Sequence, residues 1–115
     1  MASVLDKRTA DSRVYDIPCA PLLLNGAAIV SVTSVTADQG NLLIGSKSIN
    51  AAPITYLEDG LVAPANTVIQ VRISGGAIPS GMPWLECTVR GVFVTTLGET
   101  LEATVILRLV DEPNV

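Results

Sequence analysis

The chain has 115 residues, which suits one domain with one hydrophobic core. Its net charge is −4, with 7 Lys and Arg residues against 11 Asp and Glu residues and no basic run, so the composition argues against a nucleic-acid-binding surface. The absence of His excludes His-based catalytic triads, His general bases and most zinc sites.

The N-terminal part predicts an arm followed by two strands. Residues 1–12 are polar and irregular, and we expect an extended arm that lies across an adjacent subunit, with a disordered arm as the alternative. Residues 13–19 alternate apolar and polar side chains and end near two prolines, which predicts an edge strand. After an Asn-Gly turn signal, the β-branched residues 28–36 predict a second strand.

The middle of the chain carries weaker strand signals. Residues 42–44 predict a short strand, which residues 45–48 interrupt. Residues 49–57 predict a weaker strand that is broken by Pro53. Residues 62–66 contain a further proline and predict a loop.

The C-terminal part carries the strongest pattern. Residues 67–74 alternate and end at a Gly-Gly pair, which predicts another strand. Residues 84–110 form two alternating arms around the short Thr96-Leu97-Gly98 connection, which predicts an antiparallel hairpin. The side chains expected to face inward are Leu85, Cys87, Val89 and Phe93 in the first arm and Leu101, Ala103, Val105, Leu107 and Leu109 in the second.

Six or seven short strands at this spacing predict an all-β domain over residues 13–110, namely a single antiparallel immunoglobulin-like β-sandwich. The N-terminal arm over residues 1–12 precedes it and a short acidic tail over residues 111–115 follows it. A small barrel is the alternative. No apolar run reaches the roughly 18 residues that span a bilayer, and charges near the N-terminus replace the apolar segment of a signal peptide. We therefore expect the protein to stay in the cytoplasm that makes it.

No group of residues predicts a catalytic, cofactor or metal site. Cys19 and Cys87 match no metal-binding spacing, and we expect two buried free thiols rather than a disulfide. Glu99 and Glu102 are three apart on a predicted strand and so face opposite sides, which excludes an acid–base pair. The acidic pairs that lack a calcium-binding loop, and are expected in solvated turns, are Glu58-Asp59 and Asp111-Glu112.

The sequence also suggests where a partner would bind. Arg72, Arg90 and Arg108 each stand alone on an outward strand face, and we expect solvated or cross-strand-paired arginines rather than contacts to an acidic partner. The only tryptophan, Trp84, is expected to cover one end of the core, with an anchor in an interface as the alternative. Because 49% of the residues are hydrophobic, part of the apolar material is expected on the surface, where it would mark a partner interface.

Six segments in this order resemble a known group of proteins: Tyr15-Asp16-Ile17, Ile29-Val30-Ser31-Val32, Val71-Arg72-Ile73-Ser74-Gly75-Gly76, Thr88-Val89, Thr95-Thr96-Leu97-Gly98-Glu99-Thr100 and Leu107-Arg108-Leu109-Val110. The chain resembles, over about residues 11–110, the small immunoglobulin-like virion proteins of tailed bacteriophages, which are described as fibre–tail adaptor or head–tail accessory proteins. The resemblance implies a structural virion protein without catalytic residues or cofactors. It would assemble in the host cytoplasm in symmetric copies, with tail, fibre, adaptor or capsid proteins as partners, and without nucleic acid or membrane.

Three other functions were weighed. A capsid decoration protein on the head surface is the nearest alternative, because the sequence does not distinguish positions within a virion. A glycan-binding β-sandwich module is less well supported, since such modules present several aromatic rings and only 3% of these residues are aromatic. An enzyme has little support, because no catalytic group of residues is found.

Overall fold

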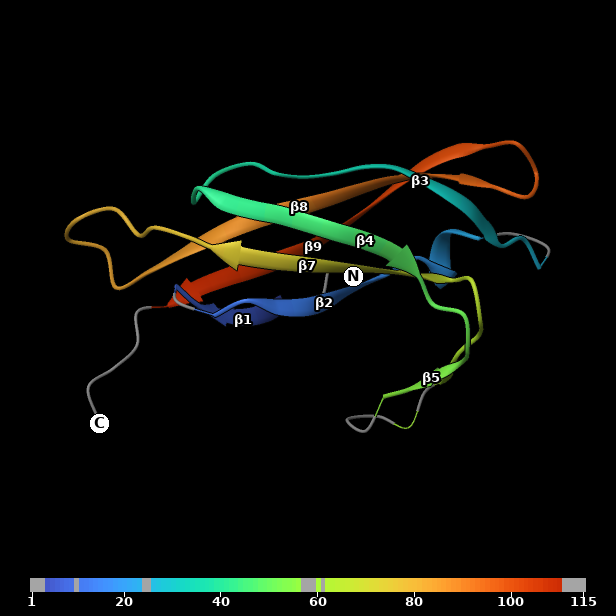
Figure 1. The fold of residues 1–115 in the computed structure, drawn as a ribbon, viewed down its shortest axis with the longest axis horizontal. Helices are drawn as coiled ribbons and strands as arrows, with labels where there is room; N and C mark the ends of the chain where they lie inside the picture. The colour runs from blue at the N-terminus through green and yellow to red at the C-terminus, as the bar shows by residue number, and fades with distance from the viewer. Residues whose placement is uncertain (1–3, 10, 24–25, 57–59, 61, 111–115) are drawn as a thin grey trace.

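The computed structural model describes residues 4–9, 11–23, 26–56, 60 and 62–110, and most of these residues lie in β-strands (Figure 1). Within these ranges the only helical segment is a single 3-10 turn, η1, over Ala20–Leu22. The predicted all-β class is therefore confirmed. The strands are β1 (Val4–Arg8), β2 (Arg13–Pro18), β3 (Ile29–Ala37), β4 (Leu42–Ile49), β5 (Ile54–Thr55), β6 (Val62–Ala63), β7 (Val68–Gly75), β8 (Trp84–Thr95) and β9 (Thr100–Val110).

The strands form two main sheets and a small ribbon. Sheet 1 has four strands in the order β1-β9-β8-β3, sheet 2 has three in the order β2-β7-β4, and β5 pairs only with β6. Every adjacent pair is antiparallel except β1 with β9, which is parallel. In Figure 1, β4 and β7 of sheet 2 lie in front of β8 and β9 of sheet 1. Because both sheets have open ends, the structure is not the closed barrel that was the alternative.

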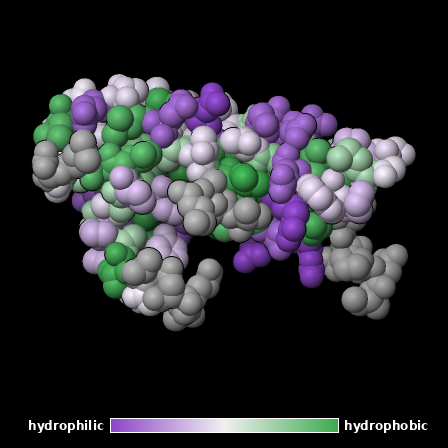
Figure 2. Space-filling model, turned by 180° about the vertical axis from the view of Figure 1, so that it is seen from behind, coloured by the Kyte–Doolittle hydropathy of each residue, from purple (hydrophilic) through white to green (hydrophobic). Residues whose placement is uncertain are grey.

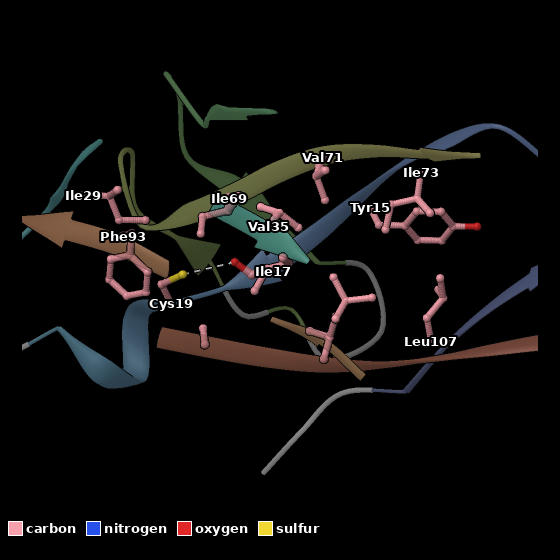
Figure 3. Close-up of a cluster of buried hydrophobic side chains, with 13 residues drawn as sticks. Tyr15, Ile17, Cys19, Ile29, Val35, Ile69, Val71, Ile73, Phe93 and Leu107 are labelled. Atoms are coloured by element: carbon pink, nitrogen blue, oxygen red, sulfur yellow. Dashed lines mark hydrogen bonds between the residues drawn. The ribbon is translucent and has the colours of Figure 1, made fainter. Parts of the chain in front are cut away.

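The core lies between the two sheets, because the inward residues of alternating strands face one another there. Ile17 on β2 and Ile69 on β7 are completely buried, and so are Phe93 on β8 and Leu107 on β9 (Figure 3). Fully burying side chains of this size stabilises a fold by about 1.5–3 kcal/mol each. A second, smaller cluster is made of Leu85, Cys87 and Leu109.

The hairpin predicted over residues 84–110 is confirmed, and its inward residues are those expected. Thr95 closes it: its backbone N–H donates to the Glu99 carbonyl at 2.9 Å, and its Oγ1 accepts the N–H groups of Leu97 at 3.2 Å and Glu99 at 3.3 Å. Gly98 has a φ of 79°, a left-handed conformation that glycine adopts without steric cost. The buried Thr95 therefore holds the Leu97 and Glu99 backbone of the turn.

The N-terminal segment differs from the arm expected over residues 1–12. Residues 4–8 form β1, which belongs to sheet 1 of the same chain. Leu5 packs against the core, and Lys7 is only 1% exposed, with its Nζ donating to the carbonyls of Gly75 at 2.5 Å and Arg8 at 2.9 Å. The expectation was wrong for this segment because Lys7 takes an inward position: backbone carbonyls accept the hydrogen bonds of its buried ammonium group.

Two further segments differ from expectation. β4 is one strand, although residues 45–48 were predicted to interrupt it, and its register against β7 shifts between Ile44 and Lys47. An irregularity of this kind admits extra residues without ending a strand. The predicted weak strand and loop that follow it contain the ribbon of β5 and β6.

Asn50 fastens this ribbon to β7. The side chain is 2% exposed, and its Oδ1 accepts the backbone N–H groups of Thr67 at 3.0 Å and Val68 at 2.9 Å. Its Nδ2 donates to the carbonyls of Ala52 and Pro64, both at 2.9 Å. The buried amide thus donates two hydrogen bonds and accepts two. A buried polar group that is hydrogen-bonded avoids the large free-energy cost of being buried without partners.

Candidate interaction surface

The two cysteines are buried and unbridged, as the sequence predicted. Cys19 lies in the main core cluster beside Phe93 (Figure 3), whereas Cys87 lies in the smaller cluster. Burial raises the pKa of Cys19 to about 12 and also raises the pKa of Cys87. Both thiols therefore stay protonated near neutral pH, unlike the thiolate of a nucleophilic cysteine.

The acidic residues do not gather into a site within the ranges that the structure describes, where no three Cys, Asp or Glu side chains are close enough to hold a metal ion. Glu102 is on the outer face of β9, and Glu99 lies in the hairpin turn, so the two do not face each other. The two predicted acidic turn pairs, Glu58-Asp59 and Asp111-Glu112, lie outside the described residues.

The outer face of sheet 1 carries cross-strand ion pairs. Arg90 Nε lies 3.6 Å from Glu102 Oε1, and Arg108 Nη2 and Nε each lie 3.0 Å from Asp6 Oδ1. The side chains of both pairs are 41–61% exposed, so each pair contributes at most about 1 kcal/mol to stability. The prediction of cross-strand-paired arginines is confirmed for Arg90 and Arg108.

The outer face of sheet 2 holds a small polar network that the sequence did not reveal. Asp16 on β2 accepts hydrogen bonds from the Tyr56 hydroxyl at 3.4 Å and from Gln70 Nε2 at 3.5 Å. Burial, with a further contribution from the nearby Asp16 charge, raises the pKa of Tyr56 to about 12. On the same face, Arg72 Nη1 donates to the carbonyl of Ser12 at 3.3 Å. These contacts tie the ribbon and the β1–β2 connection to sheet 2.

Trp84 is 44% exposed, so the expectation that it covers one end of the core was wrong. It opens β8 opposite Val110, and in the strand alternation it shares the outward face with Glu86 rather than the inward face with Leu85. The alternation was thus the signal that should have placed it outside. Met82, just before it, is also exposed, so this end of sheet 1 has apolar surface.

A second apolar area lies at the opposite end of sheet 1, near the turn of the β8–β9 hairpin. Val30 at the start of β3 is 58% exposed, and Leu97 at the turn is 55% exposed. Val92 and Val94 of β8 are half-buried and alternate with the inward Phe93, so they face outward beside these residues. Figure 2 shows sheet 1 from this side, with hydrophilic residues in a band across the middle and hydrophobic residues toward one end.

Four strand edges are open in the part of the chain that the structure describes. No strand pairs with the outer side of β1 or β3 in sheet 1, or with that of β2 or β4 in sheet 2. An open edge presents backbone N–H and C=O groups that a neighbouring chain can pair with. Together with the two apolar areas, these edges make a surface that suits binding to other proteins.

No protein-family model matches the sequence, and no curated protein is significantly similar to it. None of the helical segments in the described ranges is long and apolar enough to cross a membrane. Any assignment of function therefore depends on the fold and on this surface.

Proposed function

We propose that the chain is a non-enzymatic structural protein of a tailed-bacteriophage virion, with an immunoglobulin-like fold. It joins tail-fibre or head–tail components and is present in several symmetric copies. The proposal combines the resemblance in the sequence with the strand order and the surface of the structure.

The observation that carries the immunoglobulin-like part of the proposal is the strand order. In an immunoglobulin constant-type sandwich, strands A, B, E and D form one sheet and strands C, F and G form the other. If β2, β3, β4, β7, β8 and β9 correspond to B, C, D, E, F and G, sheet 2 has the order B-E-D and three strands of sheet 1 have the order G-F-C. β1 departs from the pattern, because it lies beside the strand in the place of G and not beside the one in the place of B.

The surface supports a structural role. Two ion pairs, Arg90–Glu102 and Arg108–Asp6, cross the strands of sheet 1. Its exposed apolar residues include Trp84, Val30 and Leu97. Aromatic residues are enriched in the centres of protein interfaces. A component that joins virion parts needs a rigid core with apolar surface and strand edges that its neighbours can cover.

The position of the aromatic rings favours this role over glycan binding. Tyr15 and Phe93 are buried in the core. Tyr56 is held against Asp16 on sheet 2, whereas Trp84 lies on the outer face of sheet 1. Because the rings are spread over different sides, they do not form a platform on which a sugar could stack.

Peptide mass spectrometry of purified tailed particles tests the proposal. Particles are banded on a density gradient, and heads and tails are then separated. We expect peptides of this chain to band with the particles and to stay with the tails or the neck. Recovery with isolated heads alone would assign the protein as a decoration protein. Its absence from every particle fraction would contradict a virion role, and specific binding to a glycan array would support a binding module instead.

A further inference from the structure

We infer that the outer edge of β3 is a self-association site, at which two copies of the chain pair their β3 strands antiparallel about a two-fold axis. The pairing would join the two copies of sheet 1 into one continuous sheet. This inference deepens the proposed structural role, since it names a surface through which copies contact each other. It is tested on the purified chain, so its outcome is independent of where the protein lies in a particle.

The four open edges differ in how they are protected against pairing. Natural sheets protect their edges with charged side chains and proline. β1 contains three consecutive charged residues, β2 contains Arg13, Asp16 and Pro18, and β4 contains Lys47. β3 is the longest of the four, with 9 residues, and its sequence IVSVTSVTA has neither a charge nor a proline. The edge of β3 is therefore the one that lacks this protection.

In the last part of β3, alternate backbone groups are not paired with β8. The Asp38 N–H donates to the Thr88 carbonyl at 3.1 Å, and Thr36 is in register with Arg90. In an antiparallel pair, alternate residues direct their N–H and C=O groups to the same neighbour. Thr36 thus bonds to β8, while Val35 and Ala37 present their backbone groups to the open side.

Two irregularities limit where pairing can occur. The register of β3 against β8 shifts between Ile29 and Ser31 and again between Val32 and Ser34. Bulges twist a strand and disrupt its ladder, which discourages pairing over that half. Only the part of β3 that follows Ser34 has a regular register, so pairing between two copies would be centred near Val35.

A second copy is the occupant that the charges favour. Two identical edges without charge meet about a two-fold axis with no like charges opposed, and isologous contacts of this kind are the commonest in homo-oligomers. The nearest charge in register with the regular part of β3, Arg90, is already paired with Glu102.

Charge placed at Thr36 tests the inference. Thr36 is exposed and points outward, so Thr36→Lys and Thr36→Glu should leave the fold intact while setting like charges near the axis. We expect the mass of the wild-type chain in solution, measured by light scattering, to rise from monomer to dimer with concentration. Each single variant should stay monomeric, and an equal mixture of the two should form the dimer again. Thr104→Lys, on exposed β9 surface away from the edge, is the matched control and should associate like the wild type.

Hydrogen–deuterium exchange gives a second measurement that needs no variant. The amides of Val35 and Ala37 should exchange more slowly as the concentration of the wild-type chain rises, whereas amides of the β5–β6 ribbon should not change. A wild-type chain that stays monomeric to its solubility limit would overturn the inference, and so would unchanged association of a folded Thr36→Lys variant. If peptides of the chain are found in particles although the purified chain is monomeric, the virion proposal stands and the β3 site is wrong.

Discussion

At the end of β4, where the chain leaves sheet 2, the side chain of Asn50 makes hydrogen bonds to the backbone at the start of β7. Its side chain makes four hydrogen bonds, to the backbone of Ala52, Pro64, Thr67 and Val68. A buried donor or acceptor left without a partner costs about 1–3 kcal/mol. This one amide therefore makes four of the hydrogen bonds that hold the ribbon of β5 and β6 against β7.

We expect Asn50→Ala to lower the free energy of unfolding by about 3 kcal/mol, because several buried backbone groups lose their partner at once. Urea denaturation followed by circular dichroism measures the change. Thr55→Ala, at an exposed position of the same ribbon, is the control and should stay within about 0.5 kcal/mol of the wild type. A similarly small effect of Asn50→Ala would show that the amide does not hold the ribbon.

The buried thiol of Cys19 makes stability depend on alkaline pH. Its pKa is raised by burial from 9.0 to about 12, so the unfolded chain loses this proton near pH 9 while the folded chain keeps it. Between these values the unfolded state binds fewer protons, and stability falls as the pH rises. We expect Cys19→Val to flatten this decline between pH 9.0 and about pH 12.

Urea midpoints measured across this pH range give the slope for each variant. Thr104→Val is the control, because it removes no titrating group, and its slope should equal that of the wild type. Burial also raises the pKa of Tyr56 and Tyr15, so part of the decline should remain in Cys19→Val. A slope unchanged by Cys19→Val would contradict the burial of the thiol.

At the scale of the strands, β1 determines whether the N-terminus is part of the fold. Deleting residues 1–9 removes the packed Leu5 and the buried Lys7 and uncovers the edge of β9. We expect the free energy of unfolding to fall by about 2 kcal/mol or more, the cost of exposing one large apolar side chain. Asp6→Asn is the control: it breaks only the exposed pair with Arg108 and should cost at most about 1 kcal/mol. A deletion variant as stable as the full chain would show that β1 does not contribute to the stability of the fold.

The strands that the sequence predicted well have a clear alternation of side chains or a β-branched composition. β2, β8 and β9 bury every second residue, so the pattern is visible in the residues themselves. β7 follows it from Ile69 onward, and β3, whose alternation is interrupted, was predicted from its β-branched composition. β1 was missed because its inward position is taken by Lys7, whose charge hides the alternation. β4 was shortened because Gly45 and its polar neighbours, which are exposed, have the composition of a turn.

The surface contacts were predictable only in part. The outward arginines were expected to be solvated or paired across strands, and the partner of Arg90, Glu102 on the adjacent strand, comes from the structure. The Asp16 network was not predictable, since its donors come from segments that only the topology brings together. The exposure of Trp84 was readable from the alternation, but the general tendency of tryptophan to be buried was given more weight.

At the scale of the whole molecule, the two sheets form one structure because their inner faces interlock. Gly91 on β8 lies between the inward Val89 and Phe93, and it leaves space that side chains of sheet 2 fill. A Cβ atom there would lie 2.9 Å from Ile69 Cδ1 and 3.4 Å from Ile17 Cδ1. In a core packed this closely, added atoms lower the stability of the fold, and the loss is larger where the neighbouring side chains cannot move away.

We expect Gly91→Val to lower the free energy of unfolding by roughly 1–3 kcal/mol. Gly91→Ala should cost less, because the nearest atom is the mobile end of the Ile69 side chain and can rotate away. Urea denaturation of both variants, with Thr104→Val as a control for adding an apolar group to exposed strand surface, measures the order. In a strand with no layer packed on it, valine would stabilise relative to glycine, since its β-propensity is higher. Stabilisation by Gly91→Val would therefore contradict the packing of sheet 2 against sheet 1 at this point.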